Sequence, residues 1–175
     1  MTLPTTAGRQ AGRPYLLRGK ARKVALTAHI LAAVGWFGVA LVVAFCGIAA
    51  SATSDPTLAP ALYRTMETSL WLSIPIGLTA VATGTILGLG TVFGLIRHWW
   101  VLAKLAIAVA IVVTDAVLVG RVAHDAVISG DAPPALYGST IAHTLLLAVA
   151  AVLSVFKPWG RTAWGRRVLA PKAER

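Results

Sequence analysis

The chain has 175 residues, of which 57% are hydrophobic and 13% are charged. Soluble domains carry about 25% charged residues, so this composition excludes a soluble enzyme and indicates a protein whose outer surface faces lipid. A net charge of +10 is typical of nucleic-acid-binding proteins, but here the basic residues are concentrated at the two ends of the chain, and we expect no nucleic-acid partner.

The first 23 residues form a basic segment. It has no acidic residue and six basic ones: Arg9, Arg13, Arg18, Lys20, Arg22 and Lys23. Such a polar segment buries too little apolar surface to fold. We therefore expect residues 1–23 to be a disordered cytoplasmic arm.

Four apolar stretches follow this arm, each long enough to supply the roughly 20 residues that a membrane-spanning helix needs. They cover residues 24–50, 70–96, 99–120 and 137–156. They are apolar on all sides and lack the alternation of barrel strands, which indicates helices. The predicted fold class is therefore all-α: an integral membrane four-helix bundle with antiparallel helices.

Short connections join the four spans. Residues 51–69 and 121–136 are predicted to be outer loops. The turn from Gly94 to Trp99 is so short that it makes the second and third spans an antiparallel hairpin. Residues 157–175 form a second basic cytoplasmic tail.

Lysine and arginine residues near the span ends predict the orientation. Six lie in residues 1–23, six lie in residues 157–175, and Arg97 lies between the second and third spans. Cytoplasmic segments carry this excess, so both termini are predicted to lie on the cytoplasmic side of a bacterial plasma membrane, next to anionic headgroups. Aromatic residues at span ends are predicted to anchor the helices at the headgroups: Tyr63, Trp71, Trp99, Trp100, Tyr137 and Trp159.

The second span is rich in glycine. Small residues let helix backbones approach closely, which matters in lipid because van der Waals packing drives helix association there. We expect these glycines to pack against other helices of the same chain, with a homo-oligomer seam as the alternative: Gly77, Gly84, Gly88, Gly90 and Gly94.

Four ionisable residues lie inside the spans, where each costs about 2.5 to 3.5 kcal/mol and is therefore a functional candidate. Counted from the span centres at about 1.5 Å per residue, His29 and Lys104 lie about 12 and 9 Å toward the cytoplasm, and Asp115 and His143 about 8 and 5 Å outward. These depths predict two pairs. The predicted polar seam adds the residues of the inner turn to them: His29, Arg97, His98, Lys104, Asp115 and His143.

Three interpretations of the seam remain open at this point. The pairs are interhelical hydrogen bonds, worth about 0.6 to 2 kcal/mol each, or they are the parts of a proton- or ion-conducting path. The third interpretation is a b-type haem redox carrier, for which His29 and His98 are the two imidazoles nearest in depth. No catalytic or metal-binding motif is present in the sequence, and we predict no other cofactor.

The chain also resembles the small four-span integral membrane proteins of unknown function that are common in high-GC bacteria, especially actinobacteria. The resemblance lies within residues 24–120 and rests on His29, Trp36, Gly38, Thr83-Gly84, Gly88-Leu-Gly-Thr91, Gly94-Leu and Arg97-His98-Trp-Trp100-Val101 through Lys104. It implies a four-helix membrane bundle and no assigned activity. The sequence therefore predicts a non-enzymatic membrane module with a buried polar seam.

Overall fold

The computed structural model describes residues 17, 19–90, 95–158, 160, 162–164 and 166. Every regular element in this part of the chain is a helix, so the all-α prediction is confirmed there. The elements are α1 (Gly19–Ala52), α2 (Leu58–Gly90), α3 (Trp99–Thr114), η1 (Asp115–Val119), α4 (Gly120–Ser129) and α5 (Pro134–Phe156). Residues 1–16, most of the C-terminal tail and Gly94 lie outside the described residues.

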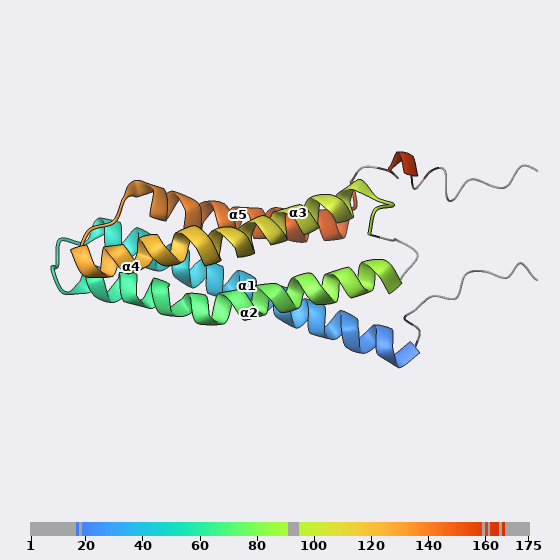
Figure 1. Ribbon diagram of the computed structural model, residues 1–175, viewed down its shortest axis with the longest axis horizontal. Helices are drawn as coiled ribbons and strands as arrows, with labels where there is room; N and C mark the ends of the chain where they lie inside the picture. Colours follow the sequence, from blue (N-terminus) through green and yellow to red (C-terminus); the bar gives the residue numbers. More distant parts are fainter. Residues whose placement is uncertain are drawn as a thin grey trace, which may run out of the picture.

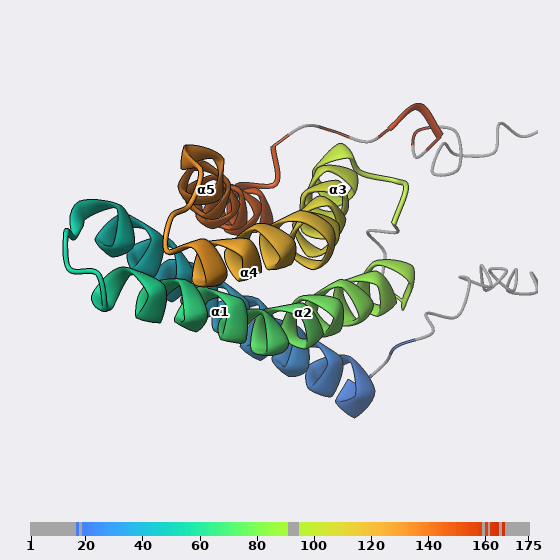
Figure 2. The same ribbon diagram turned by 60° about the vertical axis from the view of Figure 1, so that its left-hand side comes forward.

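α3, η1 and α4 form one continuous helix from Trp99 to Ser129, so the described chain contains four long helices. Each of the four is long and apolar enough to cross a membrane. Figures 1 and 2 show α1 lying beside α2 and α3 lying beside α5. The loops at residues 53–57 and 130–133 lie at one end, called the loop end, and Gly19, residues 95–98 and Lys157 lie at the other, called the terminal end.

The helices are longer than the predicted spans, chiefly at the loop end. α2 begins at Leu58 instead of residue 70, and α4 continues to Ser129, so the expected outer loops at 51–69 and 121–136 are largely helical. At the terminal end, Gly19–Lys23 belong to α1 and not to an unstructured arm. Hydropathy detects only the apolar part of a helix, and at the terminal end Lys20, Arg22 and Lys23 are good helix formers that extend α1 beyond that part.

Polar side chains support the extension of α2. The hydroxyls of Thr65, Thr68 and Ser69 donate hydrogen bonds to the backbone carbonyls four residues earlier. The Arg64 guanidinium lies 2.9 Å from a carboxylate oxygen of Glu67. Glu67 also lies 2.8 Å from Nδ1 of His124 on α4. These residues form a polar contact between α2 and α4 within a stretch that the sequence analysis assigned to loops.

Asp55 fixes the start of α2. Its carboxylate accepts hydrogen bonds from the hydroxyl and the backbone N–H of Thr57, at 2.7 and 2.8 Å, and from the N–H of Leu58. This is the pattern of a residue that caps a helix N-terminus. The Thr57 hydroxyl and then its N–H hold the pKa of the Asp55 carboxyl below its ordinary value, because both stabilise the charged form.

The loop end has a continuous apolar core, to which all four long helices contribute. Its buried members are Val43, Cys46, Ala50, Tyr63, Met66, Leu70, Val119, Ala123, Ala126, Ala132 and Leu136. A smaller cluster of Trp36, Ala80 and Ile111 lies nearer the middle of the helices. Large apolar side chains also point outward, among them Phe45 at 67% and Val155 at 75% exposure, which is the surface expected of a protein in lipid.

The glycines of α2 lie against other side chains of the same chain. A Cβ atom added at Gly77 would come within 2.9 Å of the Trp36 ring, and one at Gly84 within 3.0 Å of the His29 ring. Gly88 and Gly90 would meet Leu95 and Leu17 in the same way, at 2.8 and 2.7 Å. The first two glycines therefore make room for the two α1 rings that carry polar groups.

We predict that Gly77→Ala destabilises the protein by about 1–3 kcal/mol, because the rigid indole of Trp36 must move to admit the methyl group. Gly38→Ala is the matched control, since a Cβ atom there has no neighbour within 4 Å. Denaturant unfolding of the purified variants in detergent measures both effects. Equal stability of the two variants would contradict the packing role of Gly77.

Candidate functional site

The Asp115 and His143 side chains form a buried pair. Oδ1 of Asp115 lies 2.9 Å from Nδ1 of His143, and the two side chains are only 9% and 12% exposed. Asp115 comes from η1 and His143 from α5. The contact that the sequence predicts between these two residues is thus present.

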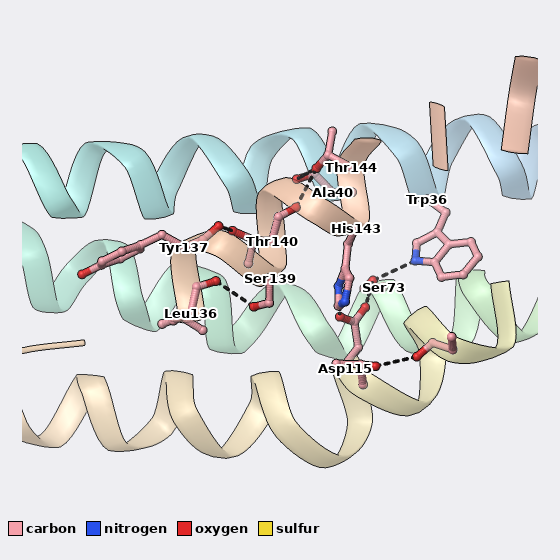
Figure 3. A network of polar contacts seen from close by, with 12 residues as sticks. Trp36, Ala40, Ser73, Asp115, Leu136, Tyr137, Ser139, Thr140, His143 and Thr144 are labelled. Carbon is pink, nitrogen blue, oxygen red and sulfur yellow. Dashed lines mark hydrogen bonds and ion pairs between the residues drawn. The ribbon is translucent and has the colours of Figure 1, made fainter. Parts of the chain in front are cut away.

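Two neutral side chains extend this pair into a network. The Ser73 hydroxyl on α2 donates to Oδ2 of Asp115 at 3.3 Å, and Nε1–H of Trp36 on α1 donates to the Ser73 oxygen at 3.1 Å. Figure 3 shows the four side chains pointing toward one another from different helices. Each carboxylate oxygen has a partner, and each of the four long helices supplies one residue of this polar network, Trp36–Ser73–Asp115–His143.

The polar network lies at mid-height. Each of its members is within two residues, or about 3 Å, of the middle of its own helix. The sequence estimate placed Asp115 and His143 about 8 and 5 Å toward the outer side. The helices extend further at the loop end than the spans from which that depth was counted.

The backbone at Asp115 is a π-helical turn. The backbone N–H of Gly120 donates to the carbonyl of Asp115, five residues earlier, and residues 115–119 make up η1. Such single turns inside α-helices are rare and occur frequently at functional sites. Asp115 therefore stands at an irregularity in the helix that the sequence gives no means to predict.

Further polar contacts lie on the loop side of the network. The hydroxyls of Tyr63 on α2 and Tyr137 on α5 are 2.6 Å apart, and the Thr144 hydroxyl donates to the Ala40 carbonyl at 3.1 Å. Tyr63 is only 2% exposed. The interpretation of Tyr63 as a headgroup anchor is therefore wrong: it is a core residue with a satisfied hydroxyl.

His29 lies in a second place, on the terminal side of the network. Its Nδ1 is 3.0 Å from the Ala80 carbonyl and 3.1 Å from the Thr83 hydroxyl, both on α2. A carbonyl only accepts hydrogen bonds, so Nδ1 carries the proton. In the neutral ring, Nε2 is then the acceptor.

His29 and Lys104 line one cavity, as the predicted inner pair requires. This terminal cavity has a volume of about 670 Å³ and is lined by residues of all four long helices. The Lys104 ammonium lies 5.7 Å from the centre of the Trp100 ring, a cation–π distance. Trp36 also lines the cavity, so it belongs both to the cavity wall and to the polar network.

Arg97 and His98 of the predicted seam lie in the turn that precedes α3. The Arg97 guanidinium lies 6.0 Å from the centre of the Trp164 ring, and the Arg97 backbone carbonyl accepts a hydrogen bond from the Thr162 N–H. His98 directly precedes α3, with its ring 6.2 Å from that of Trp100. Neither residue lines the terminal cavity, although Leu95 of the same turn does.

In the part of the chain that the structure describes, the two proposed haem ligands do not line the same cavity. His29 lines the terminal cavity and His98 does not. Within the same part of the chain, no group of three or more His, Cys, Asp and Glu residues is placed to hold a metal ion. The Asp115–His143 pair is therefore the candidate site on which the functional argument rests.

Breaking this pair should destabilise the protein, because it leaves a polar group unpaired at mid-height. We predict that Asp115→Leu lowers the free energy of unfolding by about 0.6 to 2 kcal/mol. The double variant Asp115→Leu/His143→Leu should lose less than the sum of the losses of the two single variants. Asp125→Leu, at an exposed acid on α4, is the control. Strictly additive losses in a double-mutant unfolding cycle would argue against an energetic coupling.

No protein-family model, curated protein or solved structure matches the chain. A function is therefore proposed from the geometry of the residues alone.

Proposed function

We propose that the protein is a non-enzymatic module of the bacterial plasma membrane, inserted as a four-helix antiparallel bundle with both termini in the cytoplasm. Four long apolar helices and a strongly apolar outer surface support membrane insertion. The concentration of basic residues at both ends of the chain and at Arg97 supports the orientation. The terminal end then faces the cytoplasm and the loop end faces outward.

We further propose that the Asp115–His143 pair takes up and releases protons at the centre of this membrane module. The single observation that carries the proposal is a carboxylate and an imidazole 2.9 Å apart at mid-height of four apolar helices. Carboxylates and imidazoles are the groups that relay protons inside membranes. The Ser73 hydroxyl holds the other carboxylate oxygen and keeps the first directed at His143.

The packing on the two sides of the pair favours proton binding over a permanently open ion pore. Toward the loop end, the interior is filled by the continuous apolar core. Toward the terminal end, the cavity reaches Trp36, whose indole contacts Ser73. A hydrated ion would have to displace this packing of the described residues, whereas a proton needs only a small local opening.

The proton proposal predicts a carboxyl signal that belongs to Asp115. In infrared difference spectra recorded on acidification in lipid, the wild type should gain a carboxyl C=O band that is missing in Asp115→Asn and shifted in His143→Gln. Asp125→Asn, which changes an exposed acid, should keep the band. An unchanged band in Asp115→Asn would overturn the proposal, and so would a wild-type spectrum with no change at any pH at which the protein stays folded.

Vesicle measurements test whether the site also moves protons across the membrane. Wild-type protein should speed the decay of a pH gradient across liposomes, and Asp115→Asn should return the decay to that of protein-free liposomes. Asp125→Asn should behave as the wild type does. A titrating band without any flux would restrict the role of the site to proton binding.

The orientation is tested by cysteine labelling in intact cells. The native Cys46 is buried and is first replaced by alanine. Ser54→Cys and Ser129→Cys, both at exposed positions of the loop end, should react with a membrane-impermeant thiol reagent, while Thr6→Cys and Ala173→Cys should react only after the cells are opened. The reverse labelling pattern would show the opposite orientation.

A further inference from the structure

The terminal cavity has the size and lining of a site for a hydrocarbon chain. Its volume is about 670 Å³, within the range of pockets that hold small molecules. Most of its lining is apolar, including Leu26 and Phe37 of α1, Val81 of α2, Leu105 of α3 and Leu147 of α5. Along α1 it extends from Arg22 to Phe37, which is about 22 Å of helix.

The charges of the cavity lie near its terminal end and have one sign. Arg22 and Lys104 are the charged residues among those that line it, and no acidic side chain is part of the lining. Both lie within six residues of the start of their helices. The cavity is therefore amphipathic, with cationic groups at the level of the helix ends and apolar walls that continue to mid-height.

The cavity opens sideways between α1 and α5. Its lining includes Val34, which is 66% exposed, and Val155, which is 75% exposed. On the loop side of the cavity, α1 and α5 are joined by the hydrogen bond from the Thr144 hydroxyl to the Ala40 carbonyl, and a Cβ atom added at Gly47 would lie 3.3 Å from the Tyr137 ring. In a membrane this opening faces the acyl chains of the leaflet at the terminal end.

We propose that the terminal cavity binds an anionic phospholipid, with one acyl chain in the cavity and the phosphate held by Lys104 and Arg22. Lysine binds phosphate as a point charge, and basic pockets between membrane helices bind anionic headgroups. The acyl chain would extend from the headgroup level to Trp36, along the apolar walls. The proposal rests on membrane insertion as stated under Proposed function, and not on proton uptake at Asp115.

Native mass spectrometry of the full chain in detergent tests the site with two lipids of identical acyl chains, phosphatidylglycerol and phosphatidylcholine. The wild type should retain one phosphatidylglycerol molecule and prefer it over phosphatidylcholine. Lys104→Gln should lower that preference about fivefold, the effect of one basic residue near a headgroup. Lys23→Gln is the control. It removes an exposed charge at the terminal end of α1 that does not line the cavity, and it should leave the preference unchanged.

A second pair of variants tests whether the acyl chain enters the cavity. Ala148 of α5 lines the cavity, and Ala142 of the same helix is exposed and does not. Ala148→Phe should fill the space and abolish retention of phosphatidylglycerol, whereas Ala142→Phe should retain it as the wild type does. Circular dichroism establishes that each variant keeps its helix content, and the Lys104→Gln result stands on its own where Ala148→Phe fails to fold.

Three outcomes would overturn the lipid site. They are equal retention of the two lipids by the wild type, wild-type retention by a folded Ala148→Phe, and equal effects of Lys104→Gln and Lys23→Gln. A preference for a free fatty acid over phosphatidylglycerol would also overturn it, because the phosphate would then not be the recognised group. None of these measurements depends on whether Asp115 titrates, so the lipid and proton proposals can fail separately.

Discussion

The Asp115 carboxylate has to be satisfied at mid-height of four apolar helices, and the arrangement of these helices follows from that requirement. An unpaired charge or polar group in hydrocarbon is costly. His143 pairs with one carboxylate oxygen, the Ser73 hydroxyl donates a hydrogen bond to the other, and the Trp36 N–H donates to the Ser73 oxygen. Because these three partners come from α5, α2 and α1, satisfying one side chain fixes the axial register of all four long helices. Gly77 contributes by leaving room for the Trp36 ring.

The interior differs on the two sides of this polar network. Toward the loop end, small residues such as Ala123 and Ala126 pack into a continuous core with Met66 and Leu136. Toward the terminal end, the helices enclose a cavity with basic side chains at its rim. Trp36 belongs to both regions, since its ring lines the cavity and its N–H serves the network. An occupant that reaches Trp36 would therefore touch a member of the polar network, which links the two proposed properties through one side chain.

The sequence predicted the parts of this structure that follow from rare residues. Charged and titratable groups are scarce in the spans, so Asp115 with His143, and His29 with Lys104, could be paired by depth alone. Ser73 and Trp36 could not be assigned, because neutral polar residues occur throughout membrane helices and their spacing does not reveal a partner. The position of the network along its helices could not be predicted, because the polar stretch at 58–69 continues α2, and hydropathy gives no sign of that. Arg97 and His98 of the inner turn were also placed in the seam, but neither of them lines the cavity, although Leu95 of the same turn does.

The π-helical turn at Asp115–Val119 amounts to one inserted residue in an otherwise regular helix. An insertion of this kind rotates everything that follows it by about 100°. In this chain the rotated segment is α4, which turns Ala123 and Ala126 toward the core, where they are 0% and 1% exposed. A homologue that is one residue shorter here could form a regular α-helix and still turn its small residues toward the core. Its alignment with this chain would then carry a one-residue gap within residues 115–119, and that gap would mark the absence of the π-helical turn that carries Asp115.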